Sequence, residues 1–372
     1  MYLRGMDEIT DIYYKIHGCA IMLNISQGEA DSCYSYLSKG CRLCQEGAKM
    51  VLFITGICGK NCFYCPLSNE RKADVTFANE RLVNSDNDII EEARQMGALG
   101  TGITGGEPLL KPEKVLAYIK LLKSEFGKDH HIHLYTALPL DDSILEKLAL
   151  SGLDEIRFHP PVEIWNINME NYANSIKKAM VLGMEVGLEI PAIEGAQEVS
   201  RMANELGCFV NLNELEFSDT NSEAMKLRGY KLRDEISNAV DGSYAIGMKI
   251  LKTTEKGHLC TSRYKDAIQL RRRLLRIAER AAREFDEVTE DGTLVYGVIT
   301  CNAEDNSIGR VTDILSQLGV PEELFQIDKE EIHIAPWILE EIRMEIATHV
   351  KEMCIVERYP FPGGIIVEKI PL

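Results

Sequence analysis

Three cysteines in one short segment carry the clearest chemical signal in the sequence. Cys58, Cys62 and Cys65 follow a run of apolar residues and are separated by three residues and then by two. A four-iron cluster held by only three thiolates leaves one iron open to a substrate or cosubstrate. A zinc or structural site normally has a fourth ligand nearby, and the next cysteine along the chain is Cys208. The spacing favours an open iron-sulfur cluster, with a structural metal or chance spacing as the alternative.

A second motif comes at the end of the next predicted strand and consists of Gly105, Gly106, Glu107 and Pro108. Together with Tyr64, which directly precedes the last cysteine of the loop CGKNCFYC, this GGEP motif resembles the signatures of radical S-adenosylmethionine (SAM) enzymes. The resemblance is to an archaeal-type branch related to pyruvate formate-lyase activating enzyme. It covers roughly residues 50–242.

The resemblance implies the cofactors and the reaction. Cys58, Cys62 and Cys65 would hold a [4Fe-4S] cluster, and one electron from it would cleave SAM to a 5′-deoxyadenosyl radical that abstracts hydrogen from a substrate. The GGEP motif would contact the methionine amino group. Thr136 and Ile190 fall where family members contact ribose and adenine, and the alternative is that both are ordinary strand residues.

Four more cysteines form a second candidate set. Cys41 and Cys44 are separated by two residues, a spacing that lets both thiolates reach one metal, and Cys33 precedes them in a polar, irregular segment. Cys260, just beyond the predicted barrel, could supply a fourth ligand. We predict a second, auxiliary [4Fe-4S] cluster here, with structural zinc or unliganded thiols as alternatives.

Polar side chains near the ends of later strands are candidate substrate contacts. His159 follows the fourth predicted strand, and Glu214 and Glu216 follow the sixth, where alternation places both carboxylates on one face. They could orient a cationic substrate or transfer protons. The alternative is that the carboxylates bind basic side chains or water inside the barrel.

The order of elements predicts the scaffold that positions these residues. From Met50 to Gly242, six short apolar strands alternate with amphipathic helices, which indicates parallel pairing and functional residues at the carboxyl ends of the strands. The predicted fold class is α/β: a partial (β/α)6, TIM-like radical SAM barrel with a cysteine-bearing N-terminal extension and a small C-terminal α+β domain. The predicted parts are the extension (1–49), the barrel (50–242), a connecting segment (243–263) and the C-terminal domain (264–372).

Composition and charge limit the partners. The 372 residues carry a formal net charge of −17, which repels nucleic-acid phosphates unless a local basic patch opposes it. The helix predicted over 264–285 has an arginine-rich face with Arg272, Arg276 and Arg280, which is either a solvated surface or such a patch. The sequence has neither a run of about 18 apolar residues nor a signal peptide, so we predict a cytoplasmic enzyme that contacts no membrane.

Three functions are compatible with these features. The first is a radical SAM enzyme that modifies a protein or peptide, with ferredoxin or flavodoxin as its reducing partner. The second is a radical SAM enzyme that modifies tRNA or a nucleoside-like molecule and binds RNA through the arginine-rich face. The third is a non-enzymatic iron-sulfur electron carrier or sensor. The GGEP motif opposes the third, because an electron carrier has no need to bind methionine.

Overall fold

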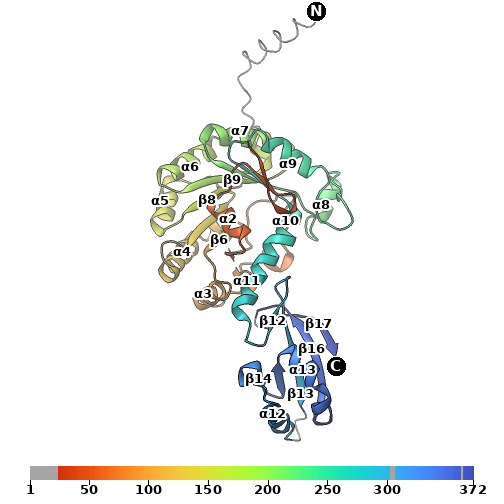
Figure 1. Ribbon diagram of the computed structural model, residues 1–372. Helices are drawn as coiled ribbons and strands as arrows, with labels where there is room; N and C mark the ends of the chain where they lie inside the picture. Colours follow the sequence, from red (N-terminus) through yellow and green to blue (C-terminus); the bar gives the residue numbers. More distant parts are fainter. Residues whose placement is uncertain (1–23, 302–305, 362) are drawn as a thin grey trace, which may run out of the picture.

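The structure is a computed structural model that describes residues 24–301, 306–361 and 363–372. Residues 1–23 of the predicted N-terminal extension, including Cys19, lie outside the described part. The chain forms an open β/α barrel, followed by a second, antiparallel sheet (Figure 1). The predicted fold class is confirmed, and the boundaries proposed between its parts stay a prediction.

Seven parallel strands form the barrel wall in the order β11-β10-β9-β8-β7-β6-β3. Within the described chain its two ends, β11 and β3, do not pair with each other, so the barrel is partial; short antiparallel strands extend each end. The strands of this sheet are β1 (Ser26–Gln27), β2 (Cys33–Tyr34), β3 (Lys49–Phe53), β4 (Phe77–Ala78), β5 (Arg81–Leu82), β6 (Gly100–Thr104), β7 (His131–Thr136), β8 (Glu155–Phe158), β9 (Glu185–Pro191), β10 (Phe209–Asn213) and β11 (Gly257–Cys260).

One parallel strand, β11, lies in the segment that we predicted to be a connection. The β/α order continues there through α9 (Ser243–Leu251) into β11, which pairs with β10 in parallel. The alternation therefore continues past Gly242 and adds a seventh parallel strand to the six that we predicted. The strand reads GHLC and is four residues long, with Leu259 and Cys260 as its only apolar residues, so hydrophobic pattern alone marks it weakly.

Helices cover the outer face of the barrel wall. Ile89, Ile119 and Ile176, on three of them, have no exposed surface. Burying one such side chain contributes about 1.5–3 kcal/mol, so this layer holds the strands in place. No helix of the described residues is long and apolar enough to cross a membrane. Besides α9, the helices are α3 (Asp86–Gln95), α4 (Pro112–Phe126), α5 (Asp142–Ser151), α6 (Glu170–Val181), α7 (Ala196–Leu206) and α8 (Ser222–Leu227).

Two helical segments occupy the concave side and the open side of the barrel (Figure 1). α2 (Lys39–Gln45) lies inside the curve of the sheet and contacts β3, β6 and β7. On the open side, α10 (Ser262–Tyr264), a π-helical segment (Lys265–Leu270) and α11 (Arg271–Ala281) run on from one another and contact α2 and α3. These helices close the gap that the partial sheet leaves.

The arginine-rich face of α11 is only partly solvated: Arg280 is exposed, whereas Arg272 and Arg276 contact the barrel. The Arg272 guanidinium donates to the backbone oxygen of Gln45 (2.8 Å) and forms an ion pair with Glu29 (2.6 Å). The Arg276 guanidinium donates to the backbone oxygen of Gly97 (2.8 Å). Two of the three arginines proposed to contact RNA therefore hold the helix against the barrel.

The C-terminal part folds around an apolar core of its own. β13 (Leu294–Cys301) lies between β15 (Glu331–Ile334) and β16 (Val350–Arg358), and α13 (Pro336–Ile346) packs on β13. All pairs in this sheet are antiparallel, in agreement with the predicted α+β character. The remaining elements are β12 (Glu287–Val288), β14 (Phe325–Asp328), β17 (Ile366–Pro371) and α12 (Ser307–Gln317).

Replacing Arg276 with Ala should destabilise the protein, because the Gly97 carbonyl loses both bonds from the guanidinium, at 2.8 and 3.3 Å. A lost hydrogen bond to a charged group costs about 1–3 kcal/mol. Urea unfolding followed by circular dichroism measures this loss. Arg271→Ala is the matched control, since Arg271 is exposed and forms no ion pair or side-chain hydrogen bond within the described residues. Equal destabilisation of both variants would contradict this role of Arg276.

Candidate active site

A chamber of about 480 Å³ opens at the carboxyl ends of the barrel strands. Its volume lies in the range of small-molecule binding sites. Its wall is built from strand residues of β3, β6, β7, β9 and β10 and from the loops that follow β3, β6 and β8. The predicted site residues that line it are Cys58, Cys62, Tyr64, Cys65, Gly105, Gly106, Pro108, Thr136 and His159.

The cysteine loop follows β3 and presents three free thiols to the chamber. Cys58 and Cys65 are exposed, and Cys62 is half-buried. Burial raises the pKa of the Cys62 thiol, and charge on Cys65 and Cys58 adds to the rise because thiolates repel one another. A bound metal centre relieves this repulsion by sharing the negative charge. Three thiols that face one space, without a fourth from the loop, fit a four-iron cluster with one open iron.

The GGEP motif and the cysteine loop are joined through their backbones. The N–H of Gly106 donates to the backbone oxygen of Thr55 (2.7 Å), and the N–H of Glu107 donates to that of Ile57 (2.9 Å). A Cβ on Gly106 would lie 2.6 Å from the Ile57 oxygen and 2.9 Å from the Cβ of Cys58, so only glycine fits. The GGEP motif therefore fixes the position of the cysteine loop.

Glu107 does not line the chamber, although its three neighbours in the motif do. Its carboxylate is buried, with the residue 1% exposed, and accepts bonds from the Thr136 hydroxyl (2.9 Å) and the Ala137 N–H (2.7 Å). The side chain thus joins the end of β6 to the end of β7. The contact with the methionine amino group, which we predicted for the GGEP motif, stays a prediction, and the Glu107 carboxylate is already engaged by the protein.

Tyr64 and His159 connect the cysteine loop to the sheet. The Tyr64 hydroxyl lies 2.8 Å from Nε2 of His159, whose Nδ1 lies 2.6 Å from the backbone oxygen of Glu189. A carbonyl oxygen only accepts, so Nδ1 carries the proton and Nε2 accepts from the Tyr64 hydroxyl. Burial lowers the pKa of His159 and so favours the neutral ring. His159 therefore positions Tyr64, the residue before the last cysteine.

The two residues predicted near ribose and adenine lie on different faces of the sheet. Thr136 lines the chamber, whereas the Ile190 side chain is fully buried in the core that includes the outer helices. Side chains alternate along a strand, so Glu189, the residue before Ile190 on β9, faces the chamber instead. Only the backbone of Ile190 could contact a ligand there.

The carboxylates predicted to contact substrate are already paired with basic side chains. Glu214 is 1% exposed and accepts from Arg233 (2.7 Å) and from the N–H of Ser262 (2.8 Å). Glu216 pairs with Lys265. Both line a smaller cavity beside the chamber. Glu214 and Glu216 therefore bind basic side chains of the protein, which is the alternative that we gave for them.

The inner part of the chamber contains residues that the sequence analysis missed, chiefly Lys49, Tyr135 and Glu189. Glu189 accepts from Arg157 (2.7 Å) and from Asn213 (3.0 Å). Burial alone would raise the pKa of Glu189, but Arg157 and the amide donors outweigh it and lower the pKa to about 2. Alternation along β7 and β9 could have identified Tyr135 and Glu189. Lys49 lies one residue before the predicted start of its strand.

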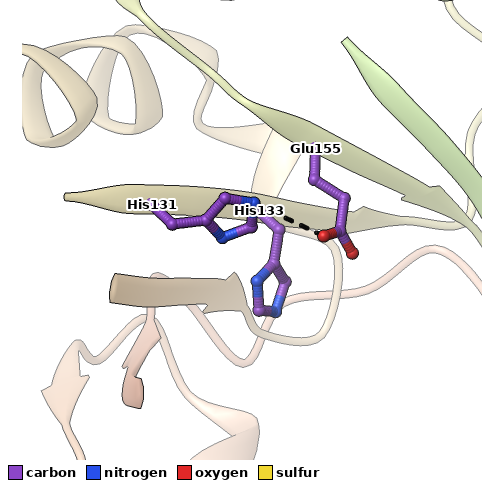
Figure 2. Close-up of side chains that lie close together, drawn as sticks. All are labelled: His131, His133 and Glu155. Atoms are coloured by element: carbon purple, nitrogen blue, oxygen red, sulfur yellow. Dashed lines mark ion pairs between the residues drawn. The ribbon is translucent and has the colours of Figure 1, made fainter. Parts of the chain in front are cut away.

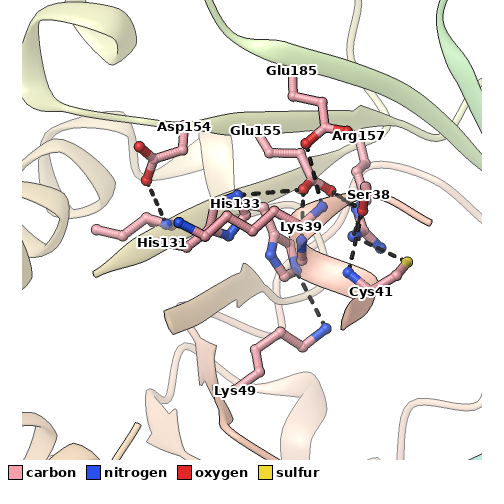
Figure 3. A network of polar contacts seen from close by, with 12 residues as sticks. Ser38, Lys39, Cys41, Lys49, His131, His133, Asp154, Glu155, Arg157 and Glu185 are labelled. Carbon is pink, nitrogen blue, oxygen red and sulfur yellow. Dashed lines mark hydrogen bonds and ion pairs between the residues drawn. The ribbon is translucent and has the colours of Figure 1, made fainter. Parts of the chain in front are cut away.

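Beyond the chamber, a buried polar network fills the barrel (Figure 3). Arg157 is 1% exposed and donates to Glu155 (2.5 Å) and to Ser38 (3.0 Å) as well as to Glu189. Glu155 also accepts from the N–H of Gly40 in α2 (3.0 Å). The network therefore ties the internal helix to β8 and β9.

Glu155 lies beside His131 and His133 (Figure 2), and ligand-type atoms of the three lie within 4.8 Å of one another. This spacing would suit a metal, but Lys49 Nζ lies 3.5 Å from Nε2 of His133. The Lys49 ammonium repels a cation placed between these groups, and the Arg157 guanidinium, which already pairs with Glu155 (2.5 Å), adds to the repulsion. We therefore assign these residues to the polar core.

The second cysteine set is divided by the sheet. Cys41 and Cys44 lie on α2 inside the barrel, not in an irregular segment as predicted. Cys33 pairs with Leu259 across β2 and β11, so it shares a face with Leu259 and lies opposite Cys260. On that face its thiol approaches the Tyr244 hydroxyl at 3.9 Å. Cys33 is thus separated from the other three, which corrects the predicted set of four.

Burial and neighbouring charges set the pKa values of two of the three remaining thiols. Burial raises the pKa of Cys260, and charge on Cys44 and Cys41 adds to the rise. Burial alone would also raise the pKa of Cys41, but the Arg157 guanidinium, 3.5 Å from its sulfur, helps to lower it to about 6. Cys44 lines a cavity of about 170 Å³ that shares Lys49 with the chamber.

Fold and chamber together define a class: an open β/α barrel whose mouth carries a three-cysteine loop held by a glycine-rich turn. The Radical SAM superfamily profile matches residues 52–206. A protein of Methanocaldococcus jannaschii, provisionally named a glycyl-radical enzyme activating enzyme, is 39% identical over 358 residues, which cover 91% of this chain and 94% of that protein. The chain belongs to the radical SAM superfamily. It is a radical SAM enzyme, and membership implies a [4Fe-4S] cluster and SAM.

Other matches are partial. Residues 292–372 match a domain of unknown function, DUF8061. Among solved structures, Streptococcus suis SuiB bound to precursor peptide SuiA is 17% identical, with a TM-score of 0.35 over 46% of this chain and 41% of that one. Methylornithine synthase (PylB) is 14% identical, with a TM-score of 0.38 over 56% of this chain and 66% of that one. The chain spans less than two thirds of either structure.

Replacing Glu107 with Gln should destabilise the protein. One carboxylate oxygen accepts from the Leu109 N–H (3.1 Å) and the other from the Ala137 N–H (2.7 Å), whereas an amide turns its NH₂ toward one of these two donors. Leaving a buried donor unpaired costs about 1–3 kcal/mol. Urea unfolding of the cluster-free protein measures the loss, with the exposed Glu113→Gln as control. Unchanged stability with weakened SAM binding would instead assign the carboxylate to the ligand.

Proposed function

We propose that this chain is an activating-type radical SAM enzyme that abstracts hydrogen from a protein or peptide. The 39% identical relative, named for the activation of a glycyl-radical enzyme, supports a protein substrate. The observation that carries the proposal is the direct packing of the cysteine loop against the GGEP turn at the mouth of one chamber. An electron carrier would not require this chamber, and the third function is set aside because the superfamily consists of enzymes.

The chamber residues divide into those that hold cofactors and those that face the substrate. Cys58, Cys62 and Cys65 hold the cluster, and the backbones of Gly105 and Gly106 receive the methionine end of SAM. When bound, the cluster supplies the electron that cleaves SAM to methionine and a 5′-deoxyadenosyl radical. Thr136 and Tyr64 line the space beside the cofactors.

The substrate-facing part of the chamber is formed by His159, Tyr135, Glu189 and Lys49. His159 keeps the role predicted for it as a substrate contact, because it lines both the chamber and the adjoining cavity. Glu214 and Glu216 take a supporting role instead, through their pairs with Arg233 and Lys265. A hydrogen taken from the substrate leaves as 5′-deoxyadenosine, and the substrate keeps the unpaired electron.

The tRNA-modifying alternative has less support. Of the arginines that it requires, Arg272 and Arg276 bind the barrel, and the chain carries a net charge of −17. For the reducing partner, the exposure of Cys58 and Cys65 at the chamber mouth favours electron delivery from an external protein such as ferredoxin or flavodoxin. A cytoplasmic location stays a prediction.

Anaerobically reconstituted protein, reduced with dithionite and given SAM, should form 5′-deoxyadenosine. Cys58→Ala, Cys62→Ala and Cys65→Ala should each abolish it, because every loop thiolate is needed to hold the cluster. Chromatographic quantification of 5′-deoxyadenosine checks this. Cys208→Ala is the matched control, since that buried cysteine lies outside the chamber. Full activity in any loop variant would refute the assignment of the cluster.

We also infer that Cys41, Cys44 and Cys260 hold the second cluster predicted from the sequence, now with three protein ligands. The support is their common place inside the barrel and the cavity that Cys44 lines beside the chamber. This cluster would lie between the chamber and α11.

Iron analysis tests the second cluster. Reconstituted protein should contain about eight irons per chain, and Cys41→Ala or Cys260→Ala should lower this to about four while 5′-deoxyadenosine formation persists. Cys33→Ala, on the other face of the sheet, should leave the iron content unchanged. About four irons in the unaltered protein would exclude the second cluster, and loss of iron in Cys33→Ala would contradict the division of the set.

A further inference from the structure

A second cleft, of about 530 Å³, is lined by no residue of the cysteine loop or of the GGEP motif. It is formed by the end of α3, the last turns of α11 and the turn after β16. None of the residues that line it also lines the chamber. The cleft therefore joins the barrel to the C-terminal part without taking part in the proposed radical chemistry.

The charge of this cleft is opposite to that of the chain. Three arginines line it, Arg94, Arg280 and Arg358, and no aspartate or glutamate does. The chain as a whole carries 58 acidic and 41 basic residues, so chance would favour carboxylates. Guanidinium groups gathered without carboxylates repel one another, and an anion bound between them removes that repulsion.

Two of the three guanidinium groups lack an acidic partner within the described residues. Arg94 pairs with Glu125. Arg358 donates only to the backbone oxygens of Tyr359 (3.5 Å) and Phe361 (3.3 Å). Arg280 makes no hydrogen bond or ion pair in that part of the chain. Its donors are therefore available to a ligand.

Arg280 is exposed, but its guanidinium rests against the backbone of Gly97. Gly97 has a positive φ of 57°, and a Cβ on it would collide with the guanidinium, which lies directly over that glycine. A planar guanidinium that is restricted on one side loses less freedom when it binds, and its fork of donors matches the oxygens of a phosphate.

The rest of the cleft is apolar. Ile277 and Pro360 line it together with Phe361, which stacks on Tyr359 with ring centroids 5.7 Å apart and an angle of 9°. The volume lies in the range of small-molecule sites. Arginines beside an aromatic ring suit a ligand that combines phosphate groups with a flat, apolar portion.

We propose that this cleft binds a small phosphate-bearing ligand, with Arg280 and Arg358 contacting the phosphate groups. The ligand would connect the barrel to the C-terminal part, since α11 supplies Arg280 and the β16 turn supplies Arg358. A nucleotide and a simple polyphosphate share this chemistry. Only the nucleotide has a flat base that could contact Phe361, so Phe361 should contribute to nucleotide binding and not to polyphosphate binding.

Isothermal titration calorimetry of the full-length protein, without reductant and with SAM present to fill the chamber, tests the site with pyrophosphate and with ATP. Both should bind one per chain, more weakly at high salt. Arg280→Ala should weaken binding about 10- to 100-fold, because a charge-assisted hydrogen bond is lost. Arg271→Ala, the exposed arginine of the same helix, should leave binding unchanged.

The two probes separate the sources of the phosphate. Tighter binding of ATP, lost in Phe361→Ala, identifies a nucleotide, whereas equal binding identifies a polyphosphate. Arg280→Lys retains the charge without the fork and should fall between Ala and the unaltered protein. Absence of binding by both probes, or binding by Arg280→Ala that equals the unaltered protein, would overturn the proposal. Because binding to this cleft needs neither reductant nor cleavage of SAM, the result is independent of the proposed radical activity.

Discussion

The chamber depends on one close approach between two backbones. Gly106 lies so near the carbonyl oxygens after β3 and the Cβ of Cys58 that no side chain fits between them. Two hydrogen bonds, from the N–H groups of Gly106 and Glu107, hold the segments at this distance. On the other side of the turn, the Glu107 carboxylate fixes it to β7. The GGEP motif, which we predicted to contact a ligand, thus also connects β6, β7 and the cysteine loop. The thiols face the chamber because this connection holds their loop in place.

A second constraint is the charge buried inside the barrel. Arg157 is taken out of water, which is tolerated only because Glu155, Glu189 and Ser38 accept its donors. Glu155 in turn accepts from the backbone of α2, so the helix that carries Cys41 and Cys44 is positioned by the same charges. Glu189 links this network to the chamber, where it is one of the substrate-facing groups. The interior is therefore one continuous polar system from α2 to the chamber.

Features that repeat along the chain, or that depend on the spacing between neighbouring residues, could be predicted from the sequence. Alternating strands and helices gave the barrel, and the cysteine spacing with GGEP gave the chamber mouth. Features that depend on strand register, which decides the residues that are neighbours across the sheet, could not be predicted from the sequence. Cys33 and Cys260 were grouped by residue type, but strand register places them on opposite faces. Ile190 and Glu189 are neighbours in sequence and belong to different layers. Neither alternative for the arginine face of α11, a solvated surface or a basic patch, includes the carbonyls of Gln45 and Gly97 that Arg272 and Arg276 bind, because these come from distant segments.

The way the barrel is closed limits how a macromolecule could reach the chamber. The helical segments from Ser262 to Ala281 occupy the gap between β11 and β3. Their Lys265 and Gln269 line the cavity of about 170 Å³ that Cys44 also lines. α2 fills the concave side (Figure 1). Entry through the side of the barrel would require these helices to separate, against the bonds of Arg272 and Arg276. A substrate can instead enter through the chamber mouth, at the carboxyl ends of the strands, without separating these helices. A protein substrate that enters there must present an extended loop or a chain end, because a folded surface cannot reach Glu189 and Tyr135 inside a chamber of about 480 Å³.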